Sequence, residues 1–341
     1  MNKRRRKGNK SFPKWVKILL IVLVLLIIIS VTTIIIVYNS FIGNINKVEI
    51  NTDDLEVNND LYNDVSDKIE KNEFDQIVNV AFFGSDSRDL HNEYAGRSDS
   101  IMIASINPVK KSIKLISIPR DTYVNVPNGY GWTKINHAYA YGQEQLSVKT
   151  INSNFGLDIT QYVTINFAGL VHIINDVGGI EMEITEAERQ YINQYVNESY
   201  VLTNNYSYIQ KVERAGKVTL TGEQALTHSR NRSVGSDFVR ASRQRDVLAA
   251  LMNKIASMDE TKILSVIQDF LKEVKTNIDV TSYLGLMTSI ISDKNTYLKN
   301  IVSVQIPTEE YGEGQMIDGV YYFVSDLNKC KEEFVKYLYD M

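Results

Sequence analysis

The residues best suited to chemistry lie together in one stretch of the chain. Residues 228–246 read HSRNRSVGSDFVRASRQRD and hold five arginines, Arg230, Arg232, Arg240, Arg243 and Arg245. From Val247 to the C-terminus there are nine lysines and no arginine. A planar guanidinium binds phosphate or carboxylate through two parallel hydrogen bonds, whereas an ammonium offers only a point charge. Clustered arginine without lysine therefore predicts an oxyanion site, although a solvated basic helix face would give a similar sequence.

Three other short motifs, GSDSRD, GRSDS and SIPRDT, each place an aspartate close to an arginine. In chain order they contain Asp86 and Arg88, Arg97 and Asp99, and Arg120 and Asp121. Carboxylate oxygens are ligands that suit Mg²⁺, while guanidinium groups neutralise the other oxygens of a bound phosphate. Surface salt bridges would produce the same spacing. Because the pattern recurs at a third place, a magnesium-bridged phosphate is the favoured interpretation.

The arginine cluster runs into a predicted helix with one distinctive face. Asp237, Arg240 and Gln244 fall on that face, which becomes apolar further along the helix. Such a face suits an amphiphile with a phosphate head and a hydrocarbon tail, and it equally suits a helix that enters its own core. Arg243 lies off this face, so we expect its replacement to be milder.

Composition and spacing exclude several other kinds of site. The four histidines are scattered without HxxxH or HExxH spacing, so a zinc hydrolase is not expected, and His228 is interpreted as structural. The sequence has no GxSxG elbow and no Walker loop. The single cysteine, Cys330, cannot form an internal disulfide. A net charge of -4 argues against bulk nucleic-acid binding.

Apolar runs and helical periodicity predict the elements that would position these residues. Strands are expected at residues 77–85, 100–106, 112–118, 161–167, 180–184 and 298–306. Helices are expected at 136–153, between Phe167 and Gly178, and at 222–230, 238–258, 261–276, 281–292 and 326–339. The interval 189–212, rich in Tyr and Asn, gives weak signals and is interpreted as an insertion. The alternation predicts an α/β fold of three layers, α-β-α, with a central mixed sheet.

The N-terminal region predicts a membrane anchor. Residues 1–17 carry eight Lys and Arg side chains, and the next twenty residues have no charge. A run of about 20 apolar residues crosses the hydrocarbon core, and its positive flank stays in the cytoplasm. A cleaved signal peptide would have a shorter apolar region, about 7–15 residues. We therefore expect a cytoplasmic tail (1–17), an uncut transmembrane anchor (18–38) and an extracytoplasmic remainder.

The chain after the anchor divides by composition. Residues 39–76 hold ten acidic and three basic side chains and few large apolar ones. This composition predicts an acidic linker with a partly helical end near residues 61–74. The folded domain is then expected to span residues 77–341.

Six ordered motifs resemble the LytR-CpsA-Psr family of cell-envelope phosphotransferases. They are GSDSRD, GRSDSIMIASINP, ISIPRDTYVNVP, KINHAYAYG, LTGEQALTHSRNR and DFVRASRQRDVL, over roughly residues 77–255. The resemblance implies an extracytoplasmic enzyme that binds a polyprenyl-pyrophosphate-linked glycopolymer of teichoic acid or capsule type. It also implies transfer of the glycan phosphate to a peptidoglycan hydroxyl, typically the 6-OH of N-acetylmuramic acid.

The same resemblance assigns roles to individual residues. Asp86 and Asp99 look like the Mg²⁺ ligands. The implied pyrophosphate clamp consists of Arg88, Arg97, Arg120, Arg230, Arg232, Arg240 and Gln244. Asp237 would orient the clamp arginines, and Asp121 would be a candidate base. No motif covers residues 189–212 or the helices after Thr261.

Two alternatives to a transferase remain open at this point. The same arginines would bind a lipid pyrophosphate without turnover in a membrane-tethered binder or regulator. A lipid pyrophosphate hydrolase would differ only in using water as the acceptor. A DNA-binding regulator is excluded, because the N-terminal basic tail and the arginine cluster fall on opposite sides of the predicted span.

Overall fold

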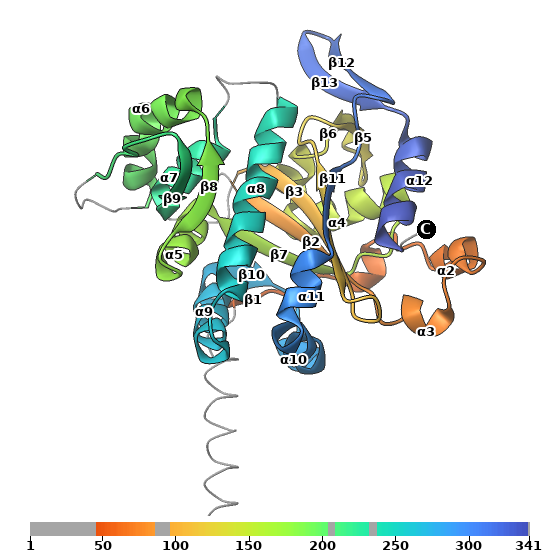
Figure 1. Cartoon of the computed structure of the whole chain (residues 1–341). Helices are drawn as coiled ribbons and strands as arrows, with labels where there is room; N and C mark the ends of the chain where they lie inside the picture. Colours follow the sequence, from red (N-terminus) through yellow and green to blue (C-terminus); the bar gives the residue numbers. More distant parts are fainter. Residues whose placement is uncertain (1–45, 86–95, 204–208, 232–236, 340–341) are drawn as a thin grey trace, which may run out of the picture. The chain divides into compact units, whose positions relative to one another are not determined.

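The computed structural model describes residues 46–85, 96–203, 209–231 and 237–339. Their centre is a seven-stranded sheet in the order β1-β10-β7-β2-β3-β4-β11 (Figure 1). In that order the strands are Asn46–Lys47, Val274–Thr276, Gln161–Asn166, Val78–Ser85, Ser98–Asn107, Ser112–Ile118 and Ile301–Gln305. Strand β7 is parallel to β2 and β11 is parallel to β4, whereas β3 is antiparallel to both of its neighbours. The prediction of a central mixed sheet is confirmed.

The central strands are buried on both faces, which explains their almost continuously apolar sequences. All seven residues of β4 are buried. In β3, Ile101 and Ile103 pack into one core, while Met102 and Ala104 pack into another. Successive side chains of a strand point to opposite faces, so each face of the sheet needs its own covering layer.

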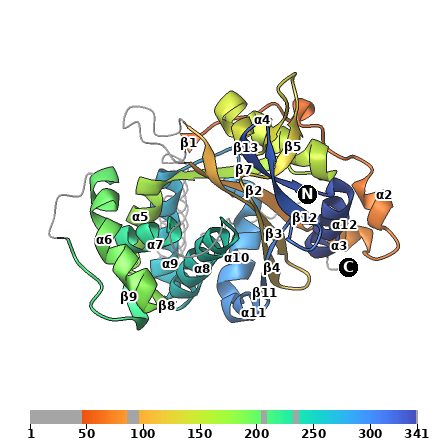
Figure 2. The ribbon, with the colours of Figure 1, turned by 90° about the horizontal axis from the view of Figure 1, so that it is seen from above.

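Helices supply those two layers, as predicted (Figure 2). One face carries α4 (His137–Phe155) and α12 (Leu327–Leu338). The other carries α8 (Asp237–Ala256), α9 (Glu260–Glu273), α10 (Leu284–Ser292) and α11 (Lys294–Lys299). The helix predicted at 261–276 ends at Glu273, because Val274–Thr276 join the sheet as the fully buried strand β10.

A second group of elements packs together with α8 and α9 around a separate apolar core. It comprises α5 (Phe167–Asp176), β8 (Ile180–Ile184), α6 (Glu186–Leu202), β9 (Gly216–Leu220) and α7 (Gly222–Ser229). The interpretation of 189–212 as a weakly structured insertion is wrong for its first part, which forms α6. Thr185 and Glu188 make a reciprocal capping box at the start of this helix. Its buried apolar side chains include Ile192, Val196 and Tyr200.

Residues 46–76 belong to the folded unit. Strand β1 pairs with β10 at the edge of the sheet, and α2 (Leu61–Val65) and α3 (Lys71–Phe74) follow. The fully or almost fully buried side chains of this segment are Leu55, Leu61, Val65 and Ile69. The predicted linker 39–76 is therefore wrong from Asn46 onward, because a few spaced apolar residues dock an otherwise acidic segment on the core. The predicted helical tendency near 61–74 is confirmed.

Two small hairpins complete the described part of the chain. They pair β5 (Tyr123–Val126) with β6 (Gly131–Lys134), and β12 (Gly312–Ile317) with β13 (Val320–Ser325). A bridge between Thr122 and Phe323 joins the two hairpins. They lie next to one another at one end of the sheet (Figure 1).

The predicted membrane anchor lies outside the described residues, as does the cytoplasmic tail. Among the residues described from Asn46 onward, no helix combines the length and apolar character needed to cross a membrane. The anchor at residues 18–38 therefore stays a prediction from the sequence.

Candidate functional site

One end of the central sheet collects several of the predicted site residues. Strands β2, β4, β7 and β11 run in one direction, so their C-terminal ends meet at this edge, where β3 begins. Ser85 at the end of β2 pairs in register with Ser98 of β3 and Asn166 of β7. Asp99 follows Ser98, and Arg120 comes two residues after the end of β4. In α/β sheets, ligands bind beyond the carboxyl ends of the strands.

Arg120 joins two of the predicted carboxylates into one cluster. Its Nη1 lies 2.9 Å from Asp99 Oδ1, and its Nε lies 3.4 Å from Asp121 Oδ2. The three side chains are only 17% (Arg120), 12% (Asp99) and 8% (Asp121) exposed. At this burial, water screens the charges less than it does at the surface. The structure therefore brings together residues from two separate motifs around one guanidinium.

Backbone hydrogen bonds fix the turn that carries Arg120 and Asp121. The Thr122 N–H donates to Pro119 O at 3.0 Å, and the Asn136 N–H donates to Arg120 O at 3.3 Å. The Phe323 N–H donates to Asp121 O at 2.9 Å. One bond within the turn and two from other segments of the chain thus hold the backbone that carries Arg120 and Asp121.

Lys134 is a member of this cluster that the sequence analysis missed. Its Nζ lies 2.6 Å from Asp121 Oδ1, and its side chain is 18% exposed. In the β5–β6 hairpin, Lys134 pairs with Tyr123, and Tyr123 comes two residues after Asp121 in the chain. The motif KINHAYAYG contains this lysine, but only the pairing of β5 with β6 reveals its contact with Asp121.

His137, in the same motif, lies near these charges. Its Nδ1 is 2.8 Å from Thr133 Oγ1. Burial lowers the pKa of His137, and the positive charges of Arg97 and Lys134 lower it further, while Asp121 acts in the opposite direction. The lowered pKa favours the neutral form of the His137 imidazole. Arg97 itself is exposed just before β3.

Arg230, from the arginine cluster, is held at the same end of the sheet. It follows α7, and its guanidinium carbon lies 5.1 Å from the centroid of the Phe167 ring. Phe167 begins α5 directly after β7. A guanidinium over an aromatic face gains a cation–π attraction, which leaves its donor edge available for an anion.

Two other arginines of the cluster have structural partners. Arg243 is 5% exposed, and its Nε lies 2.8 Å from Glu188 Oε1 on α6. Arg245 donates through Nη1 to Ser117 Oγ of β4. The expectation that Arg243→Lys is milder for binding and transfer stays a prediction. The contact with Glu188 gives Arg243 a structural role, because removal of its side chain would leave a largely buried carboxylate without its ion partner.

The remaining predicted residues fall into two groups. Asp86, Arg88 and Arg232 lie outside the described residues. The backbone places Asp237 and Arg240 in the first turn of α8, and Gln244 follows in the next turn with a half-buried side chain. The predicted start of this helix is confirmed to within one residue.

The donor atoms at this end of the sheet are compatible with Mg²⁺. Among the described residues there is no group of three or more His, Cys, Asp or Glu side chains placed to hold a metal, and Asp86 is not among them. Mg²⁺ usually takes only one or two carboxylates and completes its shell with substrate phosphates and water. Asp99 offers such a carboxylate. Next to it in the chain, the buried Ser98 Oγ has no hydrogen-bond partner within the described residues.

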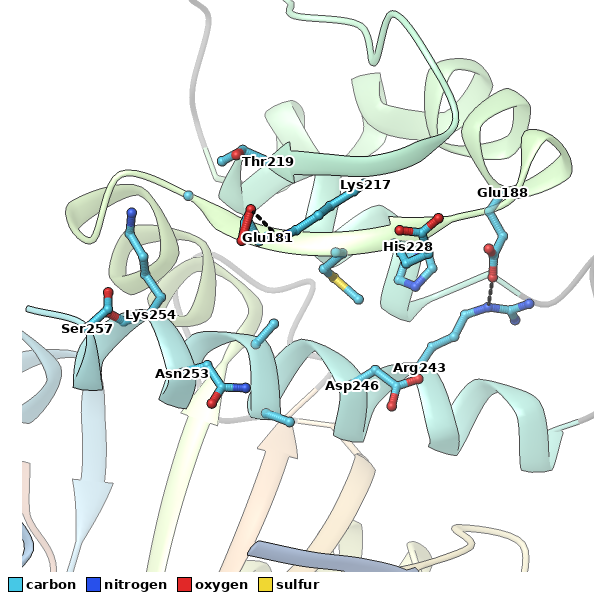
Figure 3. A pocket seen from close by; sticks show the side chains of 15 residues that line it. Glu181, Glu188, Lys217, Thr219, His228, Arg243, Asp246, Asn253, Lys254 and Ser257 are labelled. Carbon is cyan, nitrogen blue, oxygen red and sulfur yellow. Dashed lines mark hydrogen bonds and ion pairs between the residues drawn. The ribbon is translucent and has the colours of Figure 1, made fainter. Parts of the chain in front are cut away.

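A separate cavity of about 710 Å³ opens between the β8–β9 hairpin and α8 (Figure 3). Its walls include the Arg243–Glu188 pair and a Lys217–Glu181 pair with a 3.0 Å separation. The His228 ring lies between the hairpin and α8, and burial lowers its pKa to about 4. The prediction that His228 is structural agrees with this buried, neutral state. Neither the Arg120 cluster nor Arg230 lines this cavity.

Comparison with known proteins decides the family. A profile of the LytR_cpsA_psr family matches residues 43–336, almost the whole described chain. The chain belongs to the LytR-CpsA-Psr family. Its membership confirms the resemblance inferred from the six motifs.

Relatives and solved structures agree with this assignment. The chain is 32% identical to the polyisoprenyl-teichoic acid–peptidoglycan teichoic acid transferase TagU of Oceanobacillus iheyensis, over 98% of this chain and 97% of the relative. It is 30% identical to the correspondingly named TagT of Bacillus subtilis, over 96% and 95%. A solved structure of the family protein YwtF (TagT) with bound octaprenyl pyrophosphate lipid superposes with a TM-score of 0.57 at 27% identity, over 80% of this chain and 95% of that one. The two sequence relatives are named as teichoic acid transferases.

Proposed function

We propose that this family member is a phosphotransferase that moves a glycopolymer from a polyprenyl-pyrophosphate carrier to a hydroxyl of peptidoglycan. The names of its relatives and the lipid pyrophosphate bound by one of them support the substrate classes. One observation in this chain carries the proposal, namely the Arg120 guanidinium between Asp99 and Asp121 at the ligand-binding end of the sheet.

The proposed reaction breaks one phosphorus–oxygen bond and forms another. The acceptor hydroxyl oxygen attacks the phosphorus that carries the glycan. The bond from that phosphorus to the bridging oxygen of the pyrophosphate breaks, and the polyprenyl phosphate leaves with that oxygen. The hydroxyl proton passes to a base, for which Asp121 is the proposed carboxylate.

The chain's own residues would act mainly through position and charge. Arg120 and Arg230 would bind the non-bridging oxygens of the pyrophosphate, joined by Arg88, Arg97, Arg232, Arg240 and Gln244. Guanidinium groups so placed stabilise the charge that develops on the transferred phosphoryl group and its leaving group. Lys134 would hold Asp121 in place through the contact to Oδ1. Asp237 would orient the arginines at the start of α8.

Mg²⁺ would be held by Asp99 together with Asp86 and the substrate phosphates. Bound there, the ion would neutralise phosphate oxygens and fix their orientation. The buried setting of Asp99, with its side chain 12% exposed, supports this role because it limits competition from bulk water. Arg120 already balances part of the negative charge of Asp99. The Asp99 carboxylate would therefore lie between two cations, the Arg120 guanidinium and Mg²⁺.

The decisive experiment follows the glycan with the purified full-length chain in detergent. The full chain is preferable to a fragment starting at residue 77, because residues 46–76 supply buried side chains to the core. A lipid-pyrophosphate glycan is mixed with peptidoglycan, with Mg²⁺ or with a chelator. We expect glycan on peptidoglycan only when Mg²⁺ is present.

Other outcomes would support other functions. Glycan phosphate released into water would indicate a hydrolase. Tight binding of the lipid without either product would indicate a binder or regulator. Full transfer in the chelator would remove the role proposed for Mg²⁺.

A further inference from the structure

A row of three aromatic rings crosses from the β5–β6 hairpin to the β12–β13 hairpin. The Tyr123 ring centroid lies 5.3 Å from that of Trp132 and 4.8 Å from that of Tyr322. Trp132 is 54% exposed, whereas Tyr123 and Tyr322 are half-buried. The bridge between Thr122 and Phe323 holds the two hairpins together at this point. The rings therefore form one surface built from two hairpins.

None of the three rings belongs to an apolar core of the described residues. In β5, Val124 and Val126 point inward and are almost completely buried. Tyr123 lies on the other face of the hairpin, opposite Lys134, and Trp132 lies opposite Asn125 on that same face. A cluster of exposed apolar groups rimmed by polar ones commonly marks a binding surface. A ligand is therefore the best physical explanation for the outward row.

The three rings lie next to the Arg120 cluster, which contains Asp121 and Lys134. Lys134 Nζ lies 5.8 Å from the centroid of the Tyr322 ring and 6.0 Å from that of Tyr321. The same nitrogen contacts Asp121 Oδ1 at 2.6 Å. A molecule lying on the rings would thus have one end beside Asp121, the proposed base for the acceptor hydroxyl.

Charge on the second hairpin indicates which kind of molecule fits. The β12–β13 hairpin holds Glu313 and Asp318, and with the residues that flank it, 307–328, the segment contains five Asp and Glu side chains and no Lys or Arg. Negative charge of this density repels an anionic lipid surface and the phosphate-rich polymer of the donor. It does not repel a neutral sugar chain. The flat rings can stack on the C–H faces of pyranose sugars, and the exposed Asn125 amide, opposite Trp132, can bond their hydroxyls.

We propose that Tyr123, Trp132 and Tyr322 bind the acceptor glycan strand by stacking on its sugar rings, with one sugar hydroxyl directed to Asp121. The inference rests on the proposed function and adds the place where the acceptor binds. The donor lipid pyrophosphate would occupy the arginine side of the same cluster. Donor and acceptor would then approach from different elements.

The test compares variants of the full-length chain by calorimetry, using soluble peptidoglycan glycan strands and no donor. Trp132→Ala and Tyr322→Ala should each weaken glycan binding about tenfold or more, a loss comparable to that of one aromatic contact. Trp132→Phe, which keeps a ring, should retain most of the affinity. Tyr195→Ala removes a ring from the Tyr191–Tyr195 pair on α6 and should leave glycan binding unchanged.

A second measurement separates this inference from the proposed function. Binding of octaprenyl pyrophosphate should be the same in wild type and in both alanine variants. Glycan affinity within about twofold of wild type in both variants would overturn the inference, even if transfer occurs. So would a loss of binding to phosphatidylglycerol vesicles in place of glycan, since the row would then face lipid. Absence of transfer in wild type with normal glycan binding would contradict only the proposed function.

Discussion

At the scale of single residues, the proposed site is built around guanidinium groups, whose planar geometry lysine does not reproduce. Arg120 contacts Asp99 through Nη1 and Asp121 through Nε, so it uses two edges of one planar group. A lysine at this position would have one ammonium, which cannot span both carboxylates in the same way. Arg230 is similar, because its planar group lies over the Phe167 ring.

We predict that Arg120→Lys and Arg230→Lys lower the rate of glycan transfer almost as much as replacement of the same arginines by alanine. A charge-assisted hydrogen bond contributes about 1.5–3 kcal/mol, which corresponds to roughly tenfold to hundredfold in rate. The measurement is glycan transfer at physiological salt. Arg214→Lys is the matched control, because Arg214 is exposed and lies outside the site motifs. Near-wild-type transfer by both lysine variants would show that these arginines are only surface charge.

His228 gives a prediction about pH. Burial lowers its pKa from 6.5 to about 4, with Glu188 of α6 raising it and Arg243 of α8 lowering it. A histidine with a depressed folded-state pKa contributes stability above its unfolded pKa, and this stability is lost as the unfolded chain takes up the proton. The loss between pH 6.5 and 4 should be about 3 kcal/mol.

The check is the free energy of unfolding from urea titrations at pH 7 and pH 4.5. His228→Gln cannot gain this proton, so its stability should fall less over the same range. The difference in unfolding free energy between wild type and His228→Gln gives the contribution of His228 alone, because the carboxylates titrate in both proteins. Parallel pH profiles for the two chains would contradict the assignment of a buried, neutral imidazole.

At the scale of secondary-structure elements, α8 is fixed by ionic contacts as well as by apolar packing. Arg243 ties it to α6 through Glu188, and Arg245 ties it to the end of β4 through Ser117. The helix that carries Arg240 and Gln244 is therefore positioned from both sides. Loss of the Arg243–Glu188 contact should destabilise the packing of α8 without removing any proposed phosphate contact.

We predict that Arg243→Met destabilises the fold by about 3–5 kcal/mol, since Glu188 would remain buried without its partner. Adding Glu188→Gln removes that charge and keeps an acceptor for the capping box with Thr185. The double variant should therefore recover part of the loss in urea unfolding. Equal stability of the single and double variants would show that the buried charge is not the cause.

Which elements the sequence predicts depends on how strongly one physical pattern dominates. Strands β4 and β8 were predicted to the residue, since short apolar runs end at turn residues there. Helix α6 was missed because its Tyr and Asn residues form helices poorly by themselves. Its capping box and its buried apolar side chains, which depend on the fold, stabilise it. The polar hairpins were missed for a similar reason, since much of their support is tertiary.

The same distinction applies to the site. Motif spacing identified Asp99, Arg120 and Asp121, because each polar motif directly adjoins an apolar strand and the strand ends meet. Lys134 was missed, since its contact with Asp121 requires the turn of a hairpin that has no apolar pattern. The roles of Arg243 and Arg245 were also hidden, because sequence gives charge without burial.

At the scale of the whole molecule, the proposed substrates require the domain to lie outside the cytoplasm. Lipid-linked glycopolymer and peptidoglycan meet on the outer side of the cell membrane, and the basic tail 1–17 before an uncharged stretch predicts that the chain after residue 38 is outside. Direction across the membrane is thus a test of function as well as of topology. Cys330, the single cysteine, makes a clean test available, because it is buried and its pKa is raised to about 11 by that burial.

We predict that Val109→Cys in the full-length chain reacts with a membrane-impermeant maleimide in intact cells. Val109 is 50% exposed in the tight turn between β3 and β4, so the new thiol would be accessible. The wild-type chain should stay unlabelled, because Cys330 is buried and has no appreciable thiolate fraction. Ser11→Cys, in the basic tail, is the matched control and should react only after the membrane is permeabilised. The reverse pattern, with Ser11→Cys labelled in intact cells and Val109→Cys protected, would place the Arg120 cluster in the cytoplasm, away from peptidoglycan, and would exclude the proposed acceptor whatever the chemistry of the site.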